Sequence, residues 1–226
     1  MNTLIIAAHP DDEVLGCGGT IARLSKEGNS VHILILGEGV TSRYDDPAKA
    51  NAKELATLHK KAQDVGAFLG AKSVTLSKLP DNRFDTVALL DIIKIIEKKI
   101  AEIKPETVYT QHGGDLNIDH QCTFRAVLTA TRPVAGSPVK KVYGYEVGSS
   151  TEWSFGEFAP AFRPQVFVDI GATLAKKTQA MAMYESEARA FPHPRSAEAI
   201  EALAKTRGSM AGLPAAEAFH LIREIA

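Results

Sequence analysis

The sequence is poor in cysteine, in net charge and in long hydrophobic runs, and each shortage argues against a class of protein. Its two cysteines, Cys17 and Cys122, are too few for a disulfide framework, so we expect buried thiols and a reducing, cytoplasmic setting. A formal net charge of -1 gives no electrostatic reason to expect nucleic acid or an anionic membrane as a partner. No apolar stretch is long enough for a transmembrane helix, and the N-terminus does not resemble a signal peptide.

What is present is a regular alternation of strand-like and helix-like patterns along the first half of the chain. Short apolar runs, the first at residues 3–8, are followed by longer segments with a helical spacing of apolar residues. Such β-α repetition predicts a mostly parallel sheet with helices on both faces, a three-layer α/β/α fold of the Rossmann-like type. Because 45% of the residues are hydrophobic and no repeat or linker divides the chain, residues 1–226 are expected to form one domain.

The other expected elements follow from the same patterns. Strands are expected at residues 31–36, 73–76, 107–110, 141–146 and 165–169, and helices at residues 14–26, 48–69, 119–131, 174–187 and 197–210. A further helix, capped by Asp85 or Thr86, should end before Pro105. The composition of residues 215–225 favours a helix, although a last edge strand would also suit this segment.

Three glycines after the first strand invite a dinucleotide-binding interpretation, which their spacing contradicts. Gly16, Gly18 and Gly19 leave Ile21 at the position of the third glycine in G-x-G-x-x-G. The acidic residues 11–13 just before them would also repel a pyrophosphate. We therefore expect the glycines to let the first helix pack closely against the sheet, and a nicotinamide-dependent dehydrogenase is disfavoured.

Polar segments directly follow the first and fourth expected strands. They are His9-Pro10-Asp11-Asp12-Glu13 and residues 112–120. The carboxyl ends of the strands form the ligand-binding edge of an open α/β sheet, so we expect His9, Asp12 and His120 to meet there. Two imidazoles and one carboxylate with an open position are typical of a catalytic zinc, and the same set also suits iron.

These two segments carry a family resemblance. Ala8 to Glu13 after a first strand, with Asp119-His120 after the fourth, resembles the zinc-dependent N-deacetylases of the PIG-L/LmbE-like family. Residues 81–85, 114–120 and 191–196 are similar to the bacterial branch that acts on N-acetylated sugars. The resemblance extends across essentially the whole chain.

The resemblance implies a role for each matching residue. Zinc would be held by His9, Asp12 and His120. Asp11 would be the general base, and Asp119 would support the site from beside the third ligand.

One position departs from the family pattern. Many members carry a histidine three residues before the third ligand, where this chain has Asn117. An amide can donate a hydrogen bond to an oxyanion, but it cannot deliver a proton at neutral pH. The general acid is therefore open between His112, His193 and Asp11 itself. Glu13 is open between bonding a ligand or a sugar hydroxyl and placing negative charge in the first helical turn.

Further side chains leave the same sheet edge and are candidates for substrate contacts. They are Arg43, Asp81, Asn82, Arg83, His112 and Trp153. Their donors and acceptors suit sugar hydroxyls, and the flat face of a tryptophan suits a sugar ring. The competing interpretations are a surface arginine at position 43, a turn at residues 80–82, and a core or interface tryptophan.

The expected function is removal of the acetyl group from an N-acetylated amino sugar of the GlcNAc type, whether free, nucleotide-linked or lipid-linked, to give acetate and a free amine. Zn2+ is the expected cofactor, with Fe2+ as the other divalent ion considered. The alternatives are an amidase acting on another N-acyl glycoside, such as a thiol-conjugate precursor, and a sugar-binding protein without catalysis. Analogy with the family suggests a homo-oligomer, either a trimer or a hexamer.

Overall fold

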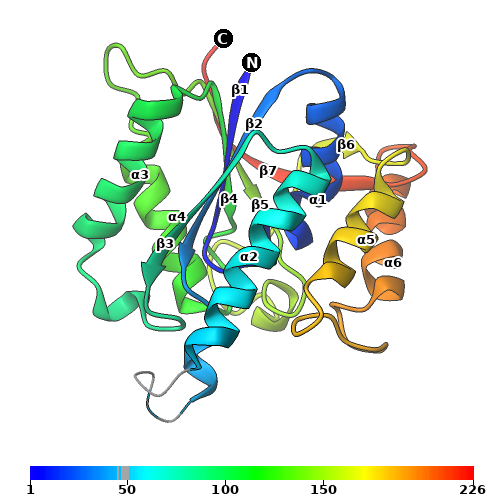
Figure 1. The fold of residues 1–226 in the computed structure, drawn as a ribbon. Helices are drawn as coiled ribbons and strands as arrows, with labels where there is room; N and C mark the ends of the chain where they lie inside the picture. The colour runs from blue at the N-terminus through cyan, green and yellow to red at the C-terminus, as the bar shows by residue number, and fades with distance from the viewer. Residues whose placement is uncertain (45, 47–50) are drawn as a thin grey trace.

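The protein is built around one seven-stranded mixed sheet with the strand order β3-β2-β1-β4-β5-β7-β6 (Figure 1). The computed structural model describes residues 1–44, 46 and 51–226. The strands are β1 (Asn2–Ala7), β2 (Ser30–Gly37), β3 (Ser73–Leu79), β4 (Thr107–Gln111), β5 (Lys141–Tyr145), β6 (Val166–Asp169) and β7 (Ala216–Glu224). Neighbouring strands from β3 to β5 run parallel, whereas β7 is antiparallel to both β5 and β6.

Helices cover both faces of this sheet. They are α1 (Asp12–Lys26), α2 (Ala52–Leu69), α3 (Leu89–Ile103), α4 (Ile118–Ala130), α5 (Leu174–Met183) and α6 (Ala197–Ser209). The helices α1, α2, α5 and α6 lie on one face, and α3 and α4 lie on the other (Figure 1). This arrangement confirms the predicted three-layer α/β/α fold. The expected start of the second helix, at residues 48–50, lies outside the described residues.

The central strand β1 supplies side chains to both hydrophobic cores. Ile5 and Ala7 pack under α1 and α2, whereas Leu4 and Ile6 pack under α3 and α4, and all four are fully buried. Successive strand residues point to opposite faces, so a strand covered on both faces needs an uninterrupted apolar run. No helix in the described part of the chain is sufficiently long and apolar to cross a lipid bilayer.

The C-terminal segment differs from expectation. Its composition favoured a helix and left an edge strand open; residues 216–224 form a strand, β7, so the helix is wrong. The segment is not an edge strand either, since β7 pairs with β5 on one side and with β6 on the other. Phe219 is fully buried and packs edge-on against the ring of Tyr109. Pairing on both sides and burial of this ring outweigh the helix propensity of the segment.

The beginning of α3 also differs from expectation. Asp85 and Thr86 belong to the 3-10 helix η3 (Phe84–Thr86) and cap no helix, so the predicted caps are wrong. Phe84 is fully buried, and its N–H donates to Asp119 Oδ1 at 2.9 Å. A tertiary contact with the polar edge of the sheet therefore shapes this turn.

The glycines of α1 allow the helix to pack directly on its neighbours, as predicted. A Cβ at Gly16 would overlap the ring of Tyr145, and a Cβ at Gly19 would lie 2.7 Å from Ile170 Cγ2. The Tyr145 ring is held in place because its hydroxyl donates to the Ile6 carbonyl at 2.8 Å. Close packing places the first turn of α1 against the sheet edge.

Replacing Gly16 by alanine should lower the free energy of unfolding by about 1–3 kcal/mol, because the anchored Tyr145 ring leaves no room for a methyl group. Chemical denaturation followed by circular dichroism measures this difference. Gly18→Ala is the matched control, since the nearest atoms to its Cβ are side-chain carbons 3.2 Å away. We expect its stability within about 1 kcal/mol of the parent. Equal stability of the two variants would contradict the packing argument.

Candidate metal centre and active site

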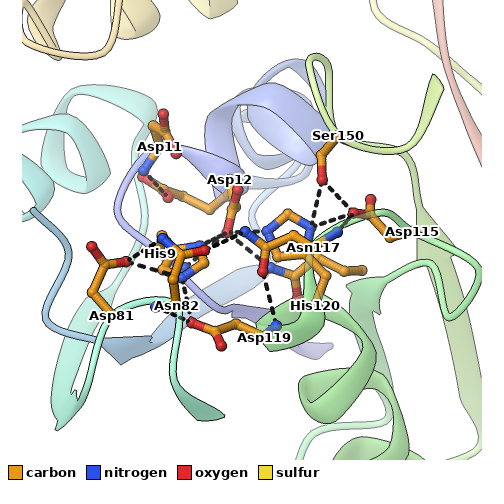
Figure 2. A network of polar contacts seen from close by, with 12 residues as sticks. His9, Asp11, Asp12, Asp81, Asn82, Asp115, Asn117, Asp119, His120 and Ser150 are labelled. Atoms are coloured by element: carbon orange, nitrogen blue, oxygen red, sulfur yellow. Dashed lines mark hydrogen bonds and ion pairs between the residues drawn. The ribbon is translucent and has the colours of Figure 1, made fainter. Parts of the chain in front are cut away.

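The two polar segments meet at the carboxyl edge of the sheet, as expected. β1 and β4 are parallel neighbours, with Thr3 opposite Thr107. The chain leaves β1 after Ala7, passes through His9 and enters α1 at Asp12, while α4 begins just before His120. The side chains of His9, Asp12 and His120 therefore face one another across the strand ends (Figure 2).

The separations within this group suit a single metal ion. Asp12 Oδ2 lies 3.4 Å from His9 Nδ1 and 3.3 Å from His120 Nε2. Ligand atoms about 2.0–2.2 Å from a tetrahedral zinc are themselves about 3.3–3.6 Å apart. Asp12 Oδ1 and His120 Nε2 are also buried without a hydrogen-bond partner. Buried polar atoms normally have partners, so these two atoms fit metal coordination.

Electrostatics at the group also favour a bound cation. Burial lowers the pKa of His120, but Asp12 and Asp115 outweigh this effect and raise it to about 9. Burial opposes ionisation of Asp12, yet His120 and His9 hold the pKa of its carboxyl well below the usual value. A site that stabilises positive charge this strongly offers the same stabilisation to a divalent ion.

Carboxylates orient both histidines from behind. Asp119 Oδ2 lies 2.9 Å from His9 Nε2, and Asp115 Oδ1 lies 3.1 Å from His120 Nδ1. Such contacts select the tautomer and ring orientation of a metal-binding histidine. Asp119 is next to the third ligand in the sequence, yet it contacts the first. Asp81 also approaches His9 Nε2, at 3.3 Å. A second cluster with ligand-like spacing therefore consists of His9, Asp81 and Asp119. It surrounds the His9 nitrogen that faces away from Asp12.

Two orienting residues were not predicted. Asp115 is fully buried and accepts hydrogen bonds from the hydroxyls of Ser150 and Thr151. Gln111, at the end of β4, donates from Nε2 to Asp12 Oδ2 at 2.9 Å. Asp115 stands inside the motif around His120, which was a usable signal, whereas Gln111 has no motif signal at all.

The turn between β1 and α1 holds its three acidic residues apart. Asp11 adopts a left-handed backbone conformation (φ 108°), and its N–H donates to Glu13 Oε2 at 3.0 Å. Glu13 is fully buried and also accepts from the Tyr184 hydroxyl at 2.6 Å. Burial raises the pKa of Glu13 to about 7. Glu13 thus lies in the first helical turn and braces the Asp11 backbone.

Asp11 is paired with an arginine that was not predicted as a site residue. Arg195 Nη1 donates to Asp11 Oδ2 at 2.7 Å, and its Nε donates to Ser149 Oγ at 2.9 Å. Glu187 lies 3.4 Å from the same Nη1. Burial raises the pKa of Asp11 to about 8, although Arg195 opposes the rise. A cation held by neighbouring Asp12 would act in the same direction as Arg195 and lower the pKa of Asp11.

Several other candidates lie apart from the metal group. His112 is fully buried, and its Nε2 donates to the Pro160 carbonyl at 2.6 Å. The two cysteines were expected as buried thiols; Cys17 is buried and Cys122 half-buried, and neither belongs to a cluster with metal-ligand spacing among the described residues. His193 Nδ1 accepts from Arg195 N at 3.1 Å, and its ring packs edge-on against Trp153.

A polar cavity of about 160 Å³ opens beside the metal group, and its wall includes His9, Asp81, Asn82, Asn117, Glu187 and Arg195. The predicted substrate residues Asp81 and Asn82 therefore reach it. Within the described part of the chain, Arg83 and Trp153 do not line this cavity. The side chain of Arg43 lies outside the described residues.

Removing the carboxylate behind His120 should weaken metal binding. Asp115→Asn is expected to lower the affinity for added zinc by about 10–100-fold, because a neutral amide replaces the charged acceptor that orients the His120 ring. Competition with a chromophoric chelator measures the affinity. Asp91→Asn, on the exposed surface of α3, is the control and should bind zinc like the parent. Parental affinity in a folded Asp115→Asn protein would contradict the orienting role.

Sequence comparisons place these residues among known proteins. The family model described as PIG-L, GlcNAc-PI de-N-acetylase, matches residues 4–131. The chain is 27% identical to an uncharacterized deacetylase, YaiS, of Escherichia coli K12, over 74% of this chain and 80% of that protein. It is 25% identical to a probable N-acetyl-alpha-D-glucosaminyl L-malate deacetylase 2 of Bacillus cereus, over 84% and 85% of the two chains.

Solved structures share the fold at lower identity. The N,N'-diacetylchitobiose deacetylase of Pyrococcus horikoshii superposes with a TM-score of 0.78 at 18% identity, covering 98% of this chain and 84% of that one. The 4-carboxy-2-hydroxymuconate hydratase GalB of Pseudomonas putida superposes with a TM-score of 0.75 at 21% identity, covering 100% and 97%. The fold alone is thus compatible with different reactions. The family model, which spans more than half of the sequence, shows that this chain belongs to the PIG-L family of de-N-acetylases.

Proposed function

We propose that the chain is a zinc-dependent hydrolase that removes the N-acetyl group from an amino sugar of the GlcNAc type. The observation that carries the proposal is the meeting of His9, Asp12 and His120 at one point, with buried Asp11 beside them. The names of the family and of the Bacillus cereus relative support an N-acetylated sugar as the substrate class. The products would be acetate and a free amine.

The donor set supports zinc as the metal. Two imidazoles and one carboxylate with an open position suit zinc, although iron accepts the same donors. Zinc in this position would polarise the acyl carbonyl and lower the pKa of a nearby water. Asp119, Asp115 and Gln111 would hold the three ligands in place through the contacts described above.

Asp11 is the residue we assign to proton transfer. It would accept a proton from the water that attacks the acyl carbon, and it would return that proton to the nitrogen as the carbon–nitrogen bond breaks. His193, the alternative acid, already accepts at Nδ1 from the backbone N–H of Arg195, and its partial burial and the charge of Arg195 lower its pKa. His112 is fully buried, and its Nε2 is bound to the Pro160 carbonyl. Asn117 would donate from its side-chain amide to the acyl oxygen.

The cavity wall supports a polar, hydroxyl-rich substrate. Asp81 offers carboxylate acceptors close to the metal group, and Asn82 is part of the same wall. Trp153, which is 40% exposed, and Arg83 would contact only parts of a substrate that extend beyond this cavity. Arg43 is retained as a substrate candidate on its sequence position alone.

Zinc-loaded protein should release acetate from N-acetylated amino sugars, and Asp11→Asn should abolish this release while keeping the metal. Loss of a general base lowers kcat by about 100-fold or more. Acetate assays over free, nucleotide-linked, lipid-linked and malate-linked GlcNAc measure the activity, and elemental analysis measures the zinc. His120→Ala is the companion variant, in which both zinc content and activity should fall.

Two results would overturn this proposal. A parent protein that releases no acetate from any substrate in the panel would remove the deacetylase assignment. An active, zinc-loaded Asp11→Asn protein would remove the role of Asp11. Release of a different acyl group from a thiol-conjugate precursor would instead identify the alternative amidase.

Arg195→Lys should lower kcat by about tenfold or more without changing the zinc content. Lysine keeps the charge, but one ammonium group cannot reproduce contacts from both Nη1 and Nε, so Asp11 loses its orientation. Steady-state acetate release measures the effect. Arg189→Lys changes an exposed arginine nearby and should retain full activity. Equal kcat values for the two variants would contradict the pairing role of Arg195.

A further inference from the structure

A chain of hydrogen bonds runs along the cavity wall and ends on Asn117. Ser42 Oγ donates to Asp81 Oδ2 at 2.6 Å, and Asn82 Nδ2 donates to Ser42 Oγ at 3.0 Å. Asn117 Nδ2 donates in turn to Asn82 Oδ1 at 3.0 Å (Figure 2). At the far end, Asn117 Oδ1 accepts from the backbone N–H of Asp119 at 2.8 Å.

The two ends of this chain determine the direction of every bond between them. An ionised carboxylate at Asp81 can only accept, and the backbone N–H of Asp119 can only donate. The nitrogen and oxygen of an asparagine amide have similar shapes, so the hydrogen-bond partners decide which atom stands where. Turning over either Asn82 or Asn117 would place donor against donor or acceptor against acceptor. Asn117 therefore presents Nδ2 to the cavity side.

Asn82 is itself held firmly at a metal ligand. Its backbone is left-handed, with φ of 54°, a conformation that is uncommon outside glycine. Its N–H donates to Asp119 Oδ2 at 2.7 Å, and the same oxygen lies 2.9 Å from His9 Nε2. The row of hydrogen bonds through Asn82 and the metal group thus share the carboxylate of Asp119.

We propose that Asn82 is a positioning residue. Its Oδ1 accepts a hydrogen bond from one Nδ2–H of Asn117 and so directs the second Nδ2–H at the acyl oxygen of the substrate. The inference rests on the proposed function, in which Asn117 donates to that oxygen. The direction of these hydrogen bonds gives the substrate carbonyl a donor. An Asn117 amide in the opposite orientation would present an oxygen and repel the carbonyl oxygen. A fixed donor needs no reorientation during the reaction.

Asn82→Gly tests this role with little risk to the fold, because glycine adopts the left-handed backbone of position 82 without strain. We expect kcat to fall by about tenfold, less than for loss of the donor itself, because Asp119 N still holds Asn117 Oδ1. KM should change by less than about twofold, since the loss lies in the transition state. Lys104→Gly makes the same kind of substitution at a left-handed residue after α3 and should leave kcat unchanged.

A double-variant cycle separates positioning from independent substrate binding. Asn117→Asp keeps an oxygen to accept from Asp119 N but removes the donor, so kcat should fall by about 100-fold. If Asn82 acts through Asn117, adding Asn82→Gly to this variant should cause no further loss. Multiplied losses in the double variant, or parental kcat in Asn82→Gly, would overturn the proposal.

A readout independent of turnover distinguishes this proposal from the proposed function. In zinc-loaded, 15N-labelled protein, the side-chain amide signals of Asn117 should shift and exchange faster with solvent in Asn82→Gly than in the parent. Unchanged Asn117 signals would overturn the positioning role even in an active enzyme. A parent that releases no acetate would overturn the deacetylase assignment, while the amide signals would still decide whether Asn82 positions Asn117.

Discussion

One carboxylate, Asp119, connects the three segments that make up the site. Its two oxygens accept from the His9 ring and from the backbone N–H groups of Asn82 and Phe84. It therefore links the turn after β1, the turn after β3 and the start of α4 within a fully buried environment. A buried carboxylate needs all its hydrogen bonds, so the geometry of each segment depends on the other two.

The three consecutive acidic residues of the first turn show how different partners give similar side chains different roles. Asp11, Asp12 and Glu13 are all at most 2% exposed. Asp12 faces two histidines, Glu13 accepts from Tyr184, and Asp11 is paired with Arg195. Burying such charges is costly without partners, and each partner here comes from a different part of the chain. The candidate metal group and Asp11, the residue proposed for proton transfer, can thus lie side by side without sharing a function.

Much of the fold and part of the site could be predicted from local patterns. The parallel strands and their helices follow from short-range periodicity, and the set His9, Asp12 and His120 follows from placing polar motifs at strand ends. Local patterns left the β7 segment open between a helix and an edge strand, because its pairing with β5 and β6 outweighs its composition. Gln111 carries no local signal. Arg195 stands in the motif 191–196, but its role could not be predicted, since its pairing with Asp11 exists only where distant segments meet.

The sequence by itself determined the α/β architecture, the family resemblance and the residues that can hold a metal, because each depends on residue type and on spacing within short segments. Only the tertiary structure decided which carboxylate orients which histidine, that Arg195 reaches Asp11, and that Asn82 faces Asn117. Those contacts join residues up to 184 positions apart. Hydrogen bonds act over about 3 Å, so their partners are set by folding and cannot be read from neighbouring residues.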